Sequence, residues 1–296
     1  MRFFLLILLL FNIQFFLSPC QLPGNEITIH YRSPQSKKDY RQKFVNEIIK
    51  AVMDNTTKRD GPYVMKAIPP MVHRRLAYTQ TQLMYTNLII RITGDLKSVK
   101  EFLAIPIPIN RGIVGYRIFL IRKNMQNLFS SIKTLKQLKR SKLKAGQGHW
   151  NDASILSINE FNVVVGRNYE GLFKMLINKR FDYFPRGVNE AYEELETRRV
   201  FFPEMEVEKT IALYYPLPRL LATNKGNKSL AKRIKRGLKI IFADGTHRKI
   251  WLRYNRKWVK RARLNKRRIF VMKNPTAINN LPYEKKEYWF HPSEKF

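Results

Sequence analysis

Apolar residues along this chain alternate between the spacing typical of helices and that of strands. Between residues 39 and 52, Phe44, Ile48, Ile49 and Val52 recur every three or four positions, which predicts a helix. Short apolar runs bounded by turn residues predict strands between such helices. The expected strands are 26–32, 63–68, 87–93, 105–109 and 116–121, and further expected helices are 73–81, 128–138, 190–197 and 230–242. This alternation indicates an α/β fold.

The segment 144–187 gives the clearest local prediction. It reads as strand, glycine-rich turn, helix, strand, helix and strand, which indicates βαβ units and a parallel sheet. The turn Gly146-Gln147-Gly148 opens onto a helix that carries Trp150 and Asp152. Unpaired N–H groups at a helix start favour an anion, so the turn is a candidate seat for a carboxylate or phosphate. Alternatively, the glycines only permit a tight turn.

Two extended passages, 115–123 and 212–223, flank this middle block. Their placement predicts a discontinuous architecture in which the chain crosses to a second lobe and returns. We expect 21–116 and 209–296 to form lobe 1, and 117–208 to form lobe 2. A ligand would then sit between the lobes, where helix starts and loops converge.

The N-terminus resembles a secretory signal peptide. Arg2 precedes an apolar run over 3–17, and Ser18-Pro19-Cys20 follows. We expect residues 1–20 to be removed on export to the periplasm, together with the single cysteine. The alternative is a lipoprotein in which Cys20 is acylated, but Pro19 stands where such a site prefers a small residue.

The chain is strongly basic, with a formal net charge of +34. The tract 248–268 holds many Lys and Arg and no acid, so it could attract nucleic acid or an anionic membrane. Basic residues occur in nearly every other segment as well, which indicates a solvated surface. We therefore do not expect specific nucleic-acid recognition.

Motifs of known catalytic chemistry are absent from the sequence. The five histidines have no metal-ligand spacing, there is no G-x-S-x-G or P-loop, and the only cysteine lies in the leader. We expect neither an enzyme nor a cofactor.

Several motifs together resemble one family, the type II periplasmic solute-binding proteins of family 3. They are DYR at 39–41, MVHRR at 71–75, IPIPINRGIVGYRIFLI at 105–121, GQGHWND at 146–152, YEGLFKMLINKRFDYFPRGVNE at 169–190, ALYYPLP at 212–218 and the tail at 272–289. The resemblance implies a Venus-flytrap fold, two α/β lobes joined by two crossing strands that close on a small ligand. It also implies a monomer that serves a membrane permease, as in ABC transport, or a sensor. The acid that holds the ligand amine in the amino-acid binders of the family has no certain counterpart here.

Nine residues are candidates for the ligand site because they follow strand ends or the glycine turn, where the cleft is expected. They are Arg111, Tyr116, Gly146, Gln147, Gly148, Trp150, Asp152, Arg186 and Glu190. An arginine can hold a carboxylate in a bidentate way. Each has a structural alternative: Arg111 as a surface cation, Tyr116 and Trp150 as packing residues, Asp152 as a helix-dipole partner.

These observations predict an exported protein that captures a small anionic or zwitterionic, amino-acid-like solute. Two alternatives remain open. The fold could serve as a partner-binding or signalling module, or the protein could act on the envelope or on nucleic acid through its charge.

Overall fold

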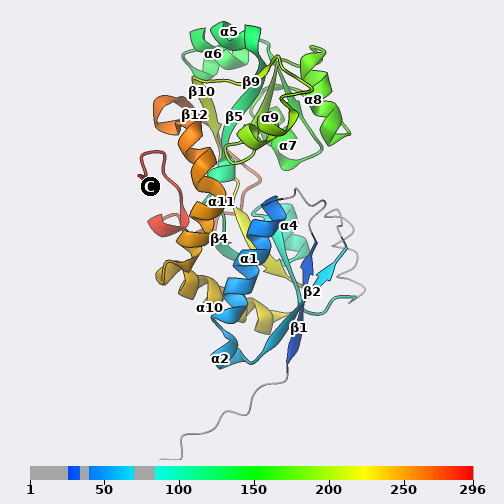
Figure 1. The fold of residues 1–296 in the computed structure, drawn as a ribbon, viewed down its shortest axis with the longest axis vertical. Coiled ribbons are helices and arrows are strands. Elements are labelled where there is room, and N and C mark those ends of the chain that lie inside the picture. The colour runs from blue at the N-terminus through cyan, green and yellow to red at the C-terminus, as the bar shows by residue number, and fades with distance from the viewer. Residues whose placement is uncertain (1–25, 34–39, 70–83, 296) are drawn as a thin grey trace, which may run out of the picture.

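The computed structural model describes residues 26–33, 40–69 and 84–295. They form two lobes stacked along the long axis of the molecule, each built around its own sheet (Figure 1). The expected signal peptide, 1–20, and the expected helix 73–81 lie outside the described residues.

Lobe 1 contains a five-stranded sheet in the order β2-β1-β3-β11-β4. Its strands are β1 (Ile27–Arg32), β2 (Tyr63–Ile68), β3 (Leu88–Thr93), β4 (Leu103–Pro108) and β11 (Arg219–Thr223). Its helices are α1 (Tyr40–Asp54), α2 (Thr57–Asp60), α4 (Leu96–Glu101) and α10 (Lys228–Ala243). The apolar stripe predicted for α1 is buried, with Ile48, Ile49 and Val52 at 0% exposure. This stripe packs α1 against the lobe core.

Lobe 2 contains a seven-stranded sheet in the order β12-β10-β5-β8-β6-β7, with β9 paired to β5. Its strands are β5 (Tyr116–Arg122), β6 (Lys144–Gln147), β7 (Asn162–Val165), β8 (Tyr183–Gly187), β9 (Met205–Val207), β10 (Ile211–Tyr214) and β12 (Arg268–Val271). Its helices are α5 (Gln126–Ser131), α6 (Leu135–Arg140), α7 (Asn151–Ile158), α8 (Tyr169–Ile177) and α9 (Ala191–Arg198). Strand β6 is parallel to both β7 and β8, so the predicted βαβ units are confirmed.

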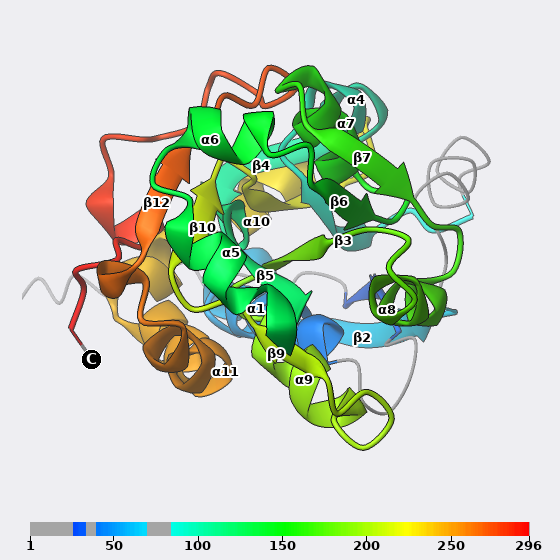
Figure 2. The ribbon, with the colours of Figure 1, turned by 90° about the horizontal axis from the view of Figure 1, so that it is seen from above.

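The predicted lobe boundary after residue 208 needs a correction. Strands β10 and β12 both belong to the sheet of lobe 2, because β10 pairs with β5 and β12 extends beside β10. The chain therefore leaves lobe 2 through 215–218 and returns to it after α11 (Thr246–Ala262). Figure 2 shows α11 and β12 on one side of the molecule, with β10 and β5 beside them.

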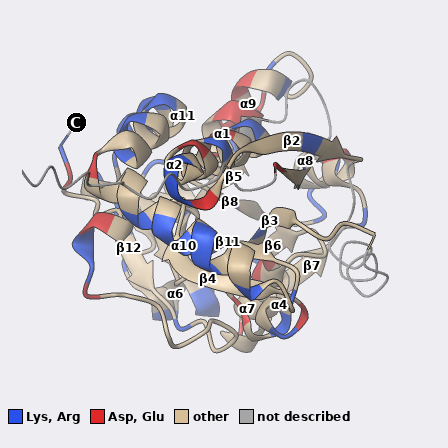
Figure 3. Cartoon of the chain, turned by 90° about the horizontal axis from the view of Figure 1, so that it is seen from below, with Lys and Arg blue, Asp and Glu red and all other residues tan. Residues whose placement is uncertain are grey.

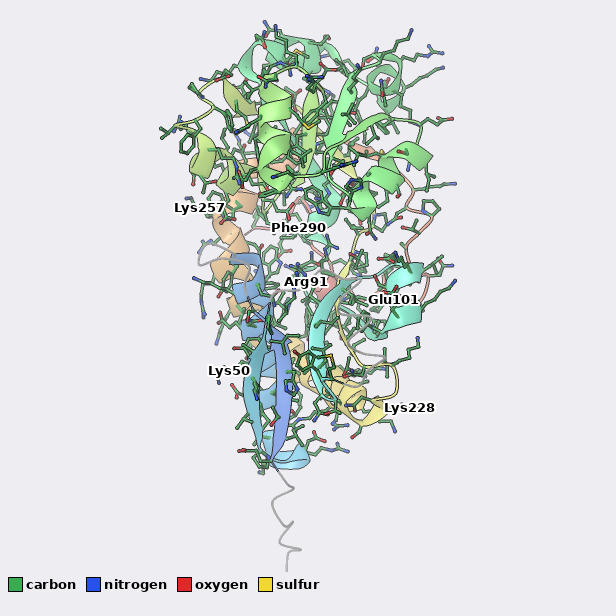
Figure 4. The ribbon with its side chains drawn as sticks, turned by 90° about the vertical axis from the view of Figure 1, so that its right-hand side faces the viewer. Lys50, Arg91, Glu101, Lys228, Lys257 and Phe290 are labelled. Atoms are coloured by element: carbon green, nitrogen blue, oxygen red, sulfur yellow. The ribbon has the colours of Figure 1, made fainter. Side chains whose placement is uncertain are left out.

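The C-terminal residues 272–295, here called the strap, run from lobe 2 back to lobe 1. Met272 N–H donates to Tyr214 O (2.8 Å) in lobe 2, and Ile278 N–H donates to Gly94 O (3.1 Å) in lobe 1. In Figure 4 the strap passes on one flank of the space between the lobes, and α11, marked by Lys257, passes on the other.

Candidate functional site

A cleft of about 2230 Å³ lies between the two lobes. Single ligand sites commonly occupy about 300–1,000 Å³, so this cleft is wider than one small ligand needs. Its polar lining comes from the ends of strands and from α7 and α9, and it includes Thr93, Asp95, Arg117, Asp152, Arg186, Asn189, Glu190 and Arg219. Figure 4 shows Arg91 at the edge of lobe 1 that faces this space.

The lobe 2 wall places a carboxylate beside a buried guanidinium. Arg117 lies on β5, and its Nη2 is 2.6 Å from Oδ1 of Asp152 on α7. The Tyr215 hydroxyl donates to the same oxygen at 2.5 Å. Burial and the Asp152 charge raise the pKa of Tyr215 well above its ordinary value, so the hydroxyl remains a donor.

Arg186 and Glu190 form the second part of this wall. Arg186 donates from Nε to Glu194 Oε2 (2.7 Å) and from Nη2 to Glu194 Oε1 (2.6 Å), and Nη2 is 3.2 Å from Glu190. Burial alone would lower the pKa of the Arg186 guanidinium, but Glu190 and Glu194 raise it well above its ordinary value. Tyr169 donates to Glu194 at 2.6 Å. Glu194 thus accepts two of the hydrogen bonds that the Arg186 guanidinium can donate, while Glu190 lies at the cleft surface.

Trp150 covers this cluster from the cleft side. It precedes the first residue of α7, is 37% exposed, and stacks on Phe184 with 6.4 Å between ring centroids. The Arg186 guanidinium lies 4.9 Å from the Trp150 ring. Trp150 is therefore both a packing residue and part of the cleft wall.

The lobe 1 wall presents the guanidinium of Arg219, which, unlike Arg117 and Arg186, is not paired with a carboxylate of the described residues. Arg219 begins β11 and pairs in register with Thr93 at the end of β3, so its Nη1 reaches the Thr93 hydroxyl. Across the described ranges, Arg219 forms no ion pair with an acid. Burial lowers its pKa, although Asp152 and Glu190 are close enough to oppose that shift. A desolvated cation that lacks a bound carboxylate favours an incoming anion.

The glycine turn serves packing rather than the cleft. A Cβ on Gly146 would lie 2.2 Å from the Phe181 ring, and a Cβ on Gly148 would lie 2.9 Å from Trp150. The Gln147 side chain is fully buried and donates to Pro185 O at 3.1 Å. These three candidates do not line the cleft, and the two glycines are needed because aromatic rings pack against their backbone.

Arg111 and Tyr116 also lie outside the cleft lining, in contrast to the expectation. Arg111 binds the strap, donating to Glu287 O (3.2 Å), Trp289 O (3.0 Å) and Glu294 Oε1 (2.8 Å). Tyr116 packs against Tyr214 and Phe290. Both belong to the crossing region, where they contact the strap rather than the cleft.

Sequence reasoning missed Arg219, Thr93 and Arg117. Arg117 is a single charge inside the apolar strand YRIFLI, and such a charge must be paired when buried. Arg219 directly follows the proline-bounded crossing segment 216–218. Either feature is a usable signal for a buried charge near the cleft.

Two further features concern metal binding and membrane crossing in the part of the chain that the structure describes. No group of three or more His, Cys, Asp and Glu side chains there is arranged to hold a metal ion. None of the described helices combines the length and apolar character needed to cross a bilayer.

Comparison with known proteins identifies the fold. No protein-family model and no curated protein matches the chain. One similar structure is a putative ABC-transporter binding component from Wolinella succinogenes in complex with lysine. It matches with a TM-score of 0.58 and 14% sequence identity, and the match covers 80% of this chain and 99% of that chain. A periplasmic binding protein of Salmonella typhimurium with high arginine specificity matches with a TM-score of 0.54 and 15% identity, covering 78% and 99%. An ancestral arginine-binding protein bound to arginine matches with a TM-score of 0.52 and 18% identity, covering 77% and 97%. The chain therefore has the two-lobed fold of periplasmic amino-acid-binding proteins, as the sequence resemblance predicted.

Proposed function

We propose that this protein binds a small zwitterionic, amino-acid-like solute in the cleft between its lobes. The observation that carries the proposal is Arg219, a half-buried guanidinium on lobe 1 that has Thr93 as its side-chain partner and faces the acids of lobe 2. The ligand carboxylate would bind Arg219 and Thr93. Its ammonium group would lie toward Asp152 and Glu190.

The charges of the two walls support this orientation. The lobe 2 cluster contains three carboxylates, of Asp152, Glu190 and Glu194, against the two guanidinium groups of Arg117 and Arg186. This cluster therefore has one negative charge in excess, whereas Arg219 places a positive charge on the facing wall of lobe 1. A zwitterion complements both, whereas a simple anion would meet the excess negative charge of lobe 2.

The size of the cleft fits an open state that closes on its ligand. Four segments connect the lobes beside the cleft: 109–115, 215–218, 263–267 and the strap. Small backbone rotations there would bring the walls together and exclude water, which strengthens the charge contacts.

We further propose that binding is not followed by catalysis, and that the protein acts as a monomer in the periplasm and delivers its ligand to a membrane permease or a sensor. The binding proteins with the same fold support a binding role. The apolar run at 3–17 supports export.

A thermal-melt screen tests this function. Arginine, lysine and neutral amino acids would be added to the full chain, together with amines and carboxylic acids that carry only one of the two charges. A ligand that binds the native state raises its melting temperature by mass action. We expect shifts only with compounds that carry both charges. Shifts with simple carboxylates alone, or with none of the compounds, would contradict the proposal.

A further inference from the structure

The outer face of α10 carries a regular row of lysines. Lys228, Lys232, Lys235 and Lys239 follow one another at spacings of four, three and four residues, so they share one side of the helix. All four are exposed. Within the described ranges none of them is paired with an acid, whereas Arg236 on the same helix is paired with Asp60. The row spans twelve residues, or roughly 16 Å from the first lysine to the last.

The row lies at the end of lobe 1 that points away from lobe 2. Figure 3 looks onto this end and shows basic residues on α10 and α2. Lys58 and Arg59 of α2 are exposed there too. We call this surface, made of the four α10 lysines with Lys58 and Arg59, the basic pole. The cleft opens between the lobes, so a partner at the basic pole leaves it accessible (Figure 1).

The start of β1 lies at the same end of lobe 1. Ile27 N–H donates to Pro62 O at 3.2 Å, and the adjoining Gly61 O accepts from Arg233 Nη2 of α10 at 2.9 Å. The described chain thus begins beside α10. Residues 3–17 are apolar and Cys20 follows them. Five residues lie between Cys20 and Glu26, so the distance between these two is at most about 20 Å.

We propose that the basic pole docks on the surface of an anionic lipid bilayer. This docking belongs to the alternative in which the N-terminus stays attached to the membrane, through uncleaved residues 3–17 or through an acyl chain on Cys20. The short stretch from Cys20 to Glu26 would hold such an anchor close to the basic pole. Lysines on flexible stems suit a planar layer of anionic headgroups, and each one near such a surface strengthens attachment about fivefold. The row carries no aromatic side chain on which nucleic-acid bases would stack, which disfavours a nucleic-acid partner.

The test compares two charge-matched variants of the full chain in vesicle sedimentation. The first replaces the α10 row by glutamine: K228Q, K232Q, K235Q and K239Q. The control replaces three exposed cations of α11 and the exposed C-cap residue that follows it, all without an acid partner among the described residues: K249Q, R256Q, K260Q and R263Q. Both lose the same charge, and glutamine is a good helix former. Vesicles of neutral lipid measure attachment through residues 3–17, and vesicles with anionic lipid measure the added electrostatic part.

We expect wild type to prefer anionic vesicles, with attachment that falls as salt rises. The α10 variant should lose that preference by roughly several hundredfold, and the α11 control by less than about fivefold. Equal losses would show that diffuse charge, not the basic pole, attracts the bilayer. Absence of any preference for anionic vesicles would overturn the proposal, as would an α10 variant that loses binding to a DNA duplex while it keeps its attachment to vesicles.

Discussion

Asn151 on lobe 2 donates a hydrogen bond from Nδ2 to Oδ2 of Asp95 on lobe 1, at 2.8 Å. Asp95 is 4% exposed, and its Oδ1 also accepts from Ser98 N–H at 2.9 Å, which caps α4. The pair joins the first residue of α7 directly to the residue before α4. It therefore links the two lobes directly and contributes to their spacing at one edge of the cleft.

Substitution of Asn151 should change that spacing. Asn151→Ala removes one contact between the lobes, worth about 0.5–1.5 kcal/mol, and Asn151→Asp places two carboxylates against each other. In small-angle scattering without ligand, we expect a larger radius of gyration for Asn151→Ala and a larger one still for Asn151→Asp. Scattering curves that superimpose on the wild-type curve would show that other contacts set the spacing.

Glu194→Gln should destabilise the protein strongly. Glu194 forms two hydrogen bonds to Arg186, and the side chains are 8% and 5% exposed, so loss of the negative charge leaves a buried guanidinium under-compensated. We expect a loss of about 3 kcal/mol in the free energy of unfolding, measured by urea denaturation. Glu160→Gln is the matched control, because Glu160 pairs with Lys139 while its side chain is 83% exposed. The control should lose less than about 1 kcal/mol. Similar losses in both variants would contradict the structural role of Glu194.

His247 predicts a pH dependence of stability. The ring is 1% exposed, its Nε2 lies 2.6 Å from Ile109 O, and burial lowers its pKa from 6.5 to about 4. Between these two values the unfolded chain binds a proton that the folded chain does not, so stability falls as the pH drops from about 6.5 to about 4. This contribution reaches about 3 kcal/mol. His247→Asn should lack it, so the difference in unfolding free energy between wild type and variant should shrink toward pH 4. Parallel pH curves for the two proteins would contradict the prediction.

The fold was predictable because its signals are local and redundant. The periodicity of residues 39–52 and the strand–helix alternation of 144–187 each follow from which side chains must be buried. The lobe boundary was not predictable in the same way. Strands β10 and β12 join lobe 2 through pairing with β5 and with each other, and pairing partners are not encoded in the local pattern of a four-residue strand.

The candidate site was only partly predictable, because burial of a charge depends on partners far away in the chain. Trp150, Asp152, Arg186 and Glu190 line the cleft. Arg111 does not, because the strap, more than 170 residues later in the sequence, supplies its acceptors. Arg219 faces the cleft through a register shared with Thr93, which only the folded sheet reveals.

Calorimetric titration of Arg219→Gln tests the central claim most directly. The probes are arginine and lysine, with their decarboxylated analogues agmatine and cadaverine, which keep the amines and lack the carboxylate. We expect wild type to bind at least one of the two amino acids and neither analogue. Arg219→Gln should bind that amino acid about ten- to a hundredfold more weakly, since a charge-assisted hydrogen bond contributes about 1.5–3 kcal/mol. Arg256→Gln, on the exposed face of α11, should bind it as wild type does. Equal affinity of wild type and Arg219→Gln, or equal binding of an amino acid and its decarboxylated analogue, would contradict a carboxylate site at Arg219.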